Sequence, residues 1–378
     1  MKFVIDKDIP YIKGLLEPYG KVAYLSGKAI TNSDLKDADA LIVRTRTCCD
    51  RHLLENTKVK YIATATIGAD HIDAEWCKKN GIKWSNAAGC NSSAVAQYTI
   101  CSLLHLSIKY NINLKNRVLG IVGVGNIGSR VKKAAEALQM QVLLNDPPKA
   151  EKNETEKFVS IDEIAACADF ISFHVPLTTT LPYPTESLAD TDFFDALKRK
   201  PFLINTSRGE IINEPALIEA IKSKKISGAV IDVWRNEPAI NRILLELTDI
   251  ATFHIAGYSV RGKLNASMMS VNNVAGFFNI PEKFEPQISM QPSVSNLNIT
   301  NDSFYAAINQ AMNASYNILS DNELLKANPH LFEKLRSEYN YRYEPESYSA
   351  SISPDSKQAE ALSEALISLG FKINYHTL

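Results

Sequence analysis

Residues 117–130 read RVLGIVGVGNIGSR, and this stretch decides the fold of the chain. The apolar run Val118–Val122 predicts a short strand, and the glycines after it follow the spacing G-x-G-x-x-G, at Gly123, Gly125 and Gly128. The first glycine permits a tight turn, the second lets a pyrophosphate approach the backbone, and the third lets a helix lie close on a sheet. This order predicts a site for a dinucleotide.

A second predicted strand, Gln141–Asn145, ends at Asp146. The helix between the two strands would begin near Asn126, where its free N–H groups could bind phosphates. A carboxylate at Asp146 can accept hydrogen bonds from the ribose hydroxyls of NAD and would repel the additional phosphate of NADP. The stretch therefore predicts a Rossmann-type domain with NAD as its cofactor.

Composition narrows the function classes. The 378 residues allow two or three domains, and the formal net charge of −1 gives no reason to expect nucleic acid or an anionic membrane as partner. No apolar run is long enough to span a bilayer, and the first residues lack the pattern of a signal peptide. Six cysteines without C-x-x-C spacing favour reduced thiols over disulfides or zinc. We expect a cytoplasmic protein without a metal site.

Short apolar strands alternate with amphipathic segments, which predicts an α/β fold with parallel sheets. In the first ninety residues we expect strands at 3–5, 22–24, 40–43, 61–63 and 83–85, and helices at 9–18 and 72–80. A long helix at 92–110 leads into the glycine-rich stretch. A second alternating series then runs to about residue 255, with further strands at 170–173, 202–205, 229–232 and 250–253.

Three strand ends of the second series carry side chains suited to the oxidation of an alcohol. Ligands of parallel sheets bind at the carboxyl ends of the strands. Arg208 could hold a carboxylate there through two parallel hydrogen bonds. His254 could take a hydroxyl proton, and Glu237 could orient its ring. Taken singly, His254 also fits a structural role and Glu237 a surface charge.

Other polar residues at strand ends are less specific. Arg44 and Arg46 could bind an anion or could equally be surface charges. Asp70 and His71 fit a helix cap and packing better than chemistry. His174 fits a structural role, because one base suffices for the reaction.

The runs NTSRGEIINEPAL at 205–217, DVWRNEP at 232–238 and HIAGY at 254–258 resemble the signature of the D-isomer-specific 2-hydroxyacid dehydrogenases, which use NAD. The resemblance covers about residues 40–280. It implies that Arg208 binds the substrate carboxylate, that His254 exchanges the proton, and that Glu237 orients and tunes His254.

The resemblance also implies a domain plan. A Rossmann-type NAD-binding domain would span residues 93–257, and a flavodoxin-like, discontinuous substrate-binding domain would span 1–92 and 258–285. A helix at 262–278 should therefore return to pack on the first ninety residues. Residues 286–378 would form a small α+β domain, with a helix at 304–319, a strand at 348–352, a helix at 357–369 and a strand at Lys372–Tyr375.

The site residues follow from the glycine-rich turn and from the resemblance. The residues expected to bind NAD are Gly123, Gly125, Asn126, Ile127, Asp146, Val175, Thr206, Ser207, Asp232 and Gly257. Val175 could contribute only its backbone, because its side chain has no polar atom. The residues expected to bind substrate are Arg44, Thr45, Thr66 and Tyr258.

Within the family, four stretches are similar to a subfamily of vitamin B6 biosynthesis that oxidises a phosphorylated four-carbon acid at C2. They are DPPKA at 146–150, the insert TLPYPT at 180–185, HIAGYSVRGK at 254–263 and the tail LRSEYNYRYEP at 335–345. This implies a small phosphorylated hydroxy acid as substrate, with the Arg44 region near its phosphate, and a homodimer formed through the C-terminal domain. Arg342 could reach a neighbouring subunit's phosphate site, although a surface charge fits it better.

Two alternatives stay open. The chain could be another D-2-hydroxyacid dehydrogenase, acting for example on D-3-phosphoglycerate or D-lactate. It could also be an NAD-sensing binding protein that kept the fold, as corepressors of the family did.

Overall fold

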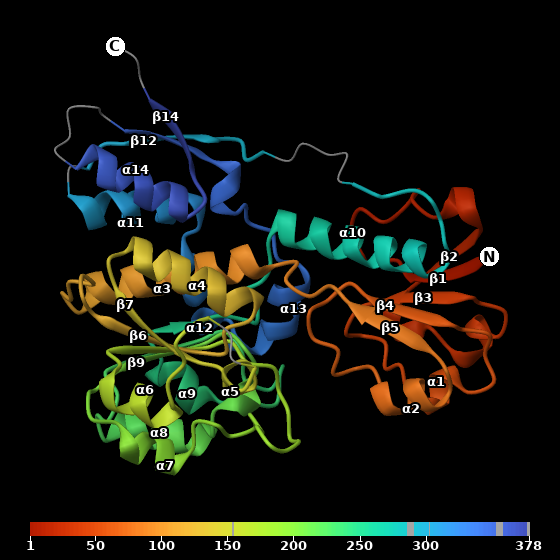
Figure 1. The fold of residues 1–378 in the computed structure, drawn as a ribbon, viewed down its shortest axis with the longest axis horizontal. Helices are drawn as coiled ribbons and strands as arrows, with labels where there is room; N and C mark the ends of the chain where they lie inside the picture. Colours follow the sequence, from red (N-terminus) through yellow and green to blue (C-terminus); the bar gives the residue numbers. More distant parts are fainter. Residues whose placement is uncertain (153–154, 286–290, 302, 353–357, 376–378) are drawn as a thin grey trace. The chain divides into compact units, whose positions relative to one another are not determined.

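The computed structural model describes residues 1–152, 155–285, 291–301, 303–352 and 358–375 (Figure 1). The chain divides into two compact units. The first comprises Met1–Asn91 and Ser259–Met290, and the second comprises Ser92–Tyr258 and Gln291–Leu378. None of the helices in these described ranges is long and apolar enough to cross a membrane.

The first unit is built on a five-stranded parallel sheet in the order β2-β1-β3-β4-β5. This is the flavodoxin-like order that the resemblance implied. The strands are β1 Lys2–Asp6, β2 Lys21–Leu25, β3 Ala40–Val43, β4 Tyr61–Thr64 and β5 Lys83–Asn86. All five strands were predicted. The clearest signals came from β1, β3 and β4, which are buried on both faces and read as mainly apolar runs.

Helices cover both faces of this sheet (Figure 1). Helix α10, Val260–Phe277, packs Leu264, Met268 and Val271 against one face, as the predicted return of the chain requires. Helices α1, Arg51–Leu54, and α2, Ala74–Lys79, cover the other.

Two local predictions for this unit are wrong. Residues 9–18 form turns and the start of a 3-10 helix rather than the predicted helix, because Tyr11 and Gly14 adopt positive φ angles of 59° and 88°. Asp70 does not cap α2. The cap is Asp73, whose Oδ1 accepts a hydrogen bond from the backbone N–H of Trp76 at 2.8 Å.

The second unit contains a six-stranded parallel sheet in the order β11-β10-β9-β8-β6-β7. The strands are β6 Val118–Val122, β7 Gln141–Asn145, β8 Phe170–Phe173, β9 Phe202–Asn205, β10 Gly228–Ile231 and β11 Ile250–Ala251. The chain leaves β6 toward β7 on one side and returns to β8 on the other. The carboxyl end of β6 is therefore the switch point at which Rossmann-type sheets bind dinucleotides.

Two layers of helices cover the two faces of this sheet (Figure 1). Helices α3 Ser92–Lys109 and α4 Asn126–Ala137 pack on one face. Helices α6 Ile161–Cys167, α7 Thr191–Ala196, α8 Glu214–Lys222 and α9 Arg242–Leu247 pack on the other. The short helix α5, Pro147–Ala150, follows β7.

The C-terminal part of this unit adds a three-stranded parallel sheet in the order β12-β13-β14. Its elements are β12 Asn296–Ile299, α11 Phe304–Ser315, α12 Ile318–Ala327, α13 Phe332–Ser337, β13 Ser349–Ile352, α14 Ala359–Ser368 and β14 Lys372–Tyr375. Helices α11 and α14 share one apolar core with α3 and α4. The 3-10 helices among the described residues are Glu17–Tyr19, Gly27–Ala29, Asn32–Leu35, Gly209–Ile211, Pro329–Leu331 and Pro345–Ser347.

Here the sequence predicted only part of the structure. The predicted helix at 304–319 ends at Ser315, and Asn317 caps a second helix by accepting a hydrogen bond from the N–H of Leu319. Strand β12 and helices α12 and α13 were not predicted. Lys357, the expected start of the last helix, and the expected domain boundary at 286 lie outside the described residues. The division into three functional domains stays a prediction.

Candidate active site

The three glycines of the glycine-rich turn meet three different demands. Gly123 has φ +90°, and a Cβ atom there would lie 2.7 Å from the backbone of His174. A Cβ atom on Gly128 would lie 2.0 Å from the carbonyl oxygen of Gly123. A Cβ atom on Gly125 would have no neighbour within 4 Å. The turn is thus closed behind Gly123 and Gly128, and it is open at Gly125, where a pyrophosphate would approach.

Asp146 lies beside this turn, at the end of β7. Its Oδ2 accepts the N–H of Val124 at 2.9 Å, and its Oδ1 accepts the N–H of Lys149 at 3.2 Å. Ionised carboxylates offer about four acceptor sites, so two bonds leave capacity for ribose hydroxyls. The N-terminus of α4, which starts at Asn126 and Ile127, supplies N–H groups for phosphates. These residues fit NAD.

The other residues predicted to contact NAD lie at the ends of neighbouring strands. Val175 follows β8 and packs against the turn, since its Cγ1 would lie 2.8 Å from a Cβ on Gly123. Thr206 and Ser207 follow β9. The Ser207 hydroxyl donates to the carbonyl of Phe173 at 2.7 Å, so it links the ends of β8 and β9.

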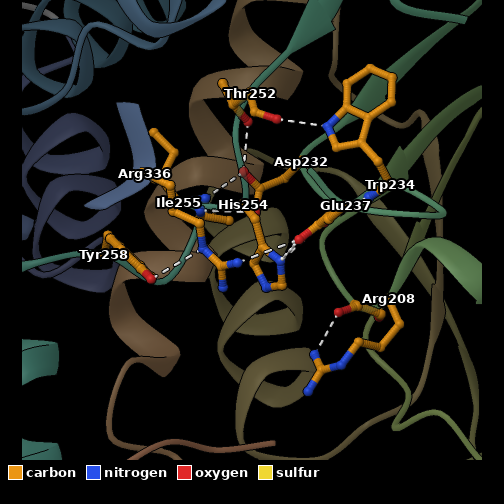
Figure 2. Close-up of polar contacts among 11 residues, drawn as sticks. Arg208, Asp232, Trp234, Glu237, Thr252, His254, Ile255, Tyr258 and Arg336 are labelled. Carbon is orange, nitrogen blue, oxygen red and sulfur yellow. Dashed lines mark hydrogen bonds and ion pairs between the residues drawn. The ribbon is translucent and has the colours of Figure 1, made fainter. Parts of the chain in front are cut away.

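The imidazole of His254 and the carboxylate of Glu237 form a hydrogen-bonded pair (Figure 2). Nδ1 of His254 lies 2.8 Å from Oε2 and 3.1 Å from Oε1 of Glu237. Oε1 also accepts the backbone N–H of Trp234 at 2.9 Å. Since the acceptor is a carboxylate, Nδ1 carries the hydrogen of the neutral ring, and Nε2 keeps its lone pair.

Glu237 is ionised in this arrangement. Burial raises the pKa of its carboxyl group, but the charge and hydrogen bond of His254, the Trp234 N–H and the charge of Arg336 outweigh burial, so the pKa lies below its usual value of 4.5. The carboxylate held against Nδ1 fixes the plane and the tautomer of the ring.

Asp232 holds the loop that carries His254. Its buried carboxylate accepts the N–H groups of Ile255 and Ala256 at 2.8 and 2.9 Å and the hydroxyl of Thr252 at 2.7 Å. These bonds (Figure 2) support the left-handed backbone of His254, whose φ is +60°. Gly257 lies in the following turn. The structure thus shows a role for Asp232 that the sequence analysis did not predict, and its contact with NAD stays a prediction.

Arg208 lies on a loop that touches the loop of Glu237. A Cβ atom on Gly209 would lie 2.1 Å from the carbonyl carbon of Trp234, so only glycine permits this approach. Nη1 of Arg208 donates to the carbonyl of Ser207 at 2.7 Å (Figure 2). The described residues therefore place Arg208, Glu237 and His254 on adjacent loops at the carboxyl edge of one sheet.

The substrate residues predicted in the first unit lie at the carboxyl ends of β3 and β4. Arg44 is ion-paired, with Nε 2.9 Å from Oδ2 of Asp6 and Nη2 3.1 Å from Oδ2 of Asp8. Thr45 is exposed. The Thr66 hydroxyl donates to the carbonyl of Gly68 at 2.8 Å.

His174 behaves as the expected structural residue. Burial lowers the pKa of its imidazole to about 3, so the ring is neutral. Nε2 lies 2.9 Å from the hydroxyl of Ser172, and Nδ1 lies 3.3 Å from that of Thr206.

The prediction for Arg342 is wrong. Its side chain is buried rather than on the surface, and it donates to the carbonyls of Ile255, Tyr258 and Ala94 at 2.9 to 3.0 Å. Its guanidinium lies 4.1 Å from the ring centroid of Tyr316. Because backbone acceptors surround the charge, Arg342 anchors the loop after His254 instead of reaching a partner's site.

The sequence analysis also missed Arg336, which lies beside Glu237 and Tyr258 in Figure 2. The signal in the sequence was the stretch LRSEYNYRYEP, which brings two arginines and three tyrosines together within eleven residues.

Comparisons with known proteins show the family to which the chain is similar. The family described as "D-isomer specific 2-hydroxyacid dehydrogenase, NAD binding domain" matches residues 105–256. The chain is 49% identical over 351 residues to the erythronate-4-phosphate dehydrogenase of Bacteroides thetaiotaomicron. This alignment covers 92% of this chain and 98% of the relative. It is 35% identical to the erythronate-4-phosphate dehydrogenase of Photorhabdus laumondii, and this alignment covers 98% of this chain and 99% of the relative.

Solved structures show the same fold. The NAD+-bound 3-phosphoglycerate dehydrogenase of Entamoeba histolytica is 28% identical, with a TM-score of 0.63 over 75% of this chain and 96% of that chain. The D-lactate dehydrogenase of Aquifex aeolicus, complexed with NAD and lactic acid, is 26% identical. Its TM-score is 0.60, over 74% of this chain and 96% of that chain.

The fold, the glycine turn and these matches define an NAD-dependent dehydrogenase that acts on a CH–OH group, as predicted. The chain belongs to the erythronate-4-phosphate dehydrogenases, within the D-isomer-specific 2-hydroxyacid dehydrogenase family.

Proposed function

We propose that this chain oxidises 4-phospho-D-erythronate at C2 to (R)-3-hydroxy-2-oxo-4-phosphooxybutanoate, with NAD, in pyridoxal 5'-phosphate biosynthesis. The names of relatives that are 34–49% identical over 90% or more of the chain support this substrate. The observation that carries the proposal is the ionised Glu237 bound to Nδ1 of His254, on a loop that touches the Arg208 loop.

Each of the three residues has one task. Arg208 binds the substrate carboxylate through two parallel hydrogen bonds and polarises the carbon–oxygen bond at C2. Nε2 of His254 accepts the proton of the C2 hydroxyl, and Glu237 stabilises the imidazolium that results. NAD, when bound, supplies the acceptor for the hydride from C2.

The remaining assignments are part of the same proposal. Arg44, Thr45, Thr66 and Tyr258 bind the substrate, and residues 1–92 with 258–285 form the substrate-binding domain. Arg44 is held by Asp6 and Asp8, so the exposed Thr45 beside it is the more accessible group for an anion. Residues 93–257 bind NAD, at Gly123, Gly125, Asn126, Ile127, Asp146, Val175, Thr206, Ser207, Asp232 and Gly257.

We further propose a cytoplasmic homodimer that forms through residues 286–378. All six cysteines are free thiols, which is typical of a reducing compartment. Twofold dimers are the commonest homo-oligomers, and the mass of the particle by light scattering tests this assignment.

The test of the reaction is NADH formation by the purified chain with four acids, each at several concentrations. The acids are 4-phospho-D-erythronate, D-erythronate, 3-phospho-D-glycerate and D-lactate. We expect the highest kcat/KM with 4-phospho-D-erythronate and a 2-oxo product by mass spectrometry. A preference for an unphosphorylated or three-carbon acid would indicate another D-2-hydroxyacid dehydrogenase. NAD binding without turnover of any acid would indicate a sensor.

A further inference from the structure

The C-terminal segment 336–342 packs against the loop that carries His254. The ring of Tyr339 makes edge contacts with Phe253 and Tyr258, at centroid distances of 5.9 and 6.3 Å. Tyr341 makes another with Tyr258, at 6.1 Å. Together with Arg342 on the loop carbonyls, these contacts join the C-terminal segment to the candidate active site within one compact unit.

Arg336 is the residue of this segment that reaches functional side chains. Its Nε donates to the hydroxyl oxygen of Tyr258 at 3.2 Å, and its Nη1 lies 3.5 Å from Oε2 of Glu237 (Figure 2). The same Oε2 binds Nδ1 of His254. The Arg336 side chain is only 20% exposed, so solvent screens its charge weakly.

We propose that Arg336 is a positioning residue of the dehydrogenase reaction, which holds the Glu237 carboxylate against His254 and orients the Tyr258 hydroxyl. The proposal rests on the function proposed above for these residues. Arginine has only donors, so the Tyr258 oxygen must act as acceptor toward it.

The contact with Glu237 has an electrical consequence. A fixed positive charge beside Oε2 contributes to the lowered pKa of the Glu237 carboxyl group and so favours the ionised carboxylate. Because Glu237 must be ionised to hold Nδ1 of His254, Arg336 keeps the pair intact toward lower pH. The C-terminal segment thereby becomes part of the active site.

The test compares Arg336→Met, Arg336→Lys and the control Lys334→Met, which removes an exposed charge from the same helix. The measurements are kcat/KM against pH with 4-phospho-D-erythronate, KM at the optimum, thermal stability, and the titration of the His254 imidazole by NMR without substrate. We expect Arg336→Met to lower kcat/KM about tenfold, to raise KM, and to move both the acid limb and the NMR midpoint to higher pH. Arg336→Lys should restore the pH profile, because lysine supplies the charge. It should recover only part of the change in KM, because lysine is a point charge without the planar fork of arginine. Lys334→Met should match the wild type.

The outcomes separate the two proposals. Suppose that the wild type turns over the substrate, and that Arg336→Met leaves the acid limb and the NMR midpoint unchanged. This result leaves the proposed function intact but overturns the role of Arg336. A loss of activity that accompanies only a fall in thermal stability also overturns it, since a merely structural role would not move the titration. Absence of wild-type turnover overturns the proposed function and, with it, the role of Arg336.

Discussion

Nδ1 of His254 lies 2.8 Å from Oε2 of Glu237, although 17 residues separate the two in the chain. The pair forms because β10 and β11 are adjacent and parallel, so the loops that follow them leave the same edge of the sheet. Asp232, at the end of β10, then binds the N–H groups of the loop after β11 and fixes its path. The relative position of imidazole and carboxylate is thus determined by buried backbone contacts.

Removal of either partner should separate their contributions. His254→Ala should lower kcat by about 10²- to 10⁴-fold, the usual contribution of a general base. Glu237→Gln keeps the shape of the side chain but removes the charge that stabilises the imidazolium, so it should also lower kcat, by less. Steady-state kinetics at the pH optimum checks both. Equal kcat for His254→Ala and the wild type would exclude this base.

Arg208→Ala should abolish most turnover without weakening the cofactor site. Two charge-assisted hydrogen bonds are worth about 3 kcal/mol or more, so kcat/KM should fall by at least about a hundredfold. NAD affinity, measured by titration without substrate, should stay at the wild-type value, since the proposed contacts of Arg208 are to the substrate. Arg208→Lys should recover part of the loss. Turnover that survives Arg208→Ala would refute the assignment.

The glycine-rich turn allows a matched pair of variants. Gly125→Ala places its Cβ in open space, so we expect an unchanged melting temperature and weaker NAD binding. Gly128→Ala places its Cβ 2.0 Å from the carbonyl oxygen of Gly123, so the helix must shift, and the protein should lose about 1–3 kcal/mol of stability. Thermal melts and NAD titrations read out the two effects. Equal behaviour of the two variants would contradict an open face at Gly125.

His174 should contribute to the pH dependence of stability. Its pKa is lowered from 6.5 to about 3 in the folded chain, so between these values the unfolded chain binds a proton that the folded chain does not. Its contribution is complete above pH 6.5 and declines as pH falls, by about 1.4 kcal/mol per pH unit. The free energy of unfolding, measured with urea, should fall with decreasing pH between 6.5 and 5. In His174→Asn this fall per pH unit should be smaller by that amount. Identical slopes would mean that His174 titrates normally.

Elements of the two parallel sheets were predicted closely because their physical signals are local. Strands β6, β7, β8 and β9 begin and end at the predicted residues, since most of their side chains are buried and the strands read as apolar runs between polar loops. The errors fall where the signal is not local. The expected helix at 9–18 does not form, because residues in it adopt positive φ angles. The expected helix at 304–319 is two helices, because Asn317 caps a new one.

The sequence by itself determined the class of the protein. Glycine spacing, a terminal acid on the next strand and three strand-end motifs predict an NAD-dependent dehydrogenase, because strand order makes these residues converge at one sheet edge. Only the tertiary structure decided what holds the site together. Arg336 and Arg342 come from a segment about eighty residues after His254. Their roles depend on which carbonyls and carboxylates surround each charge, and that environment exists only after the chain has folded.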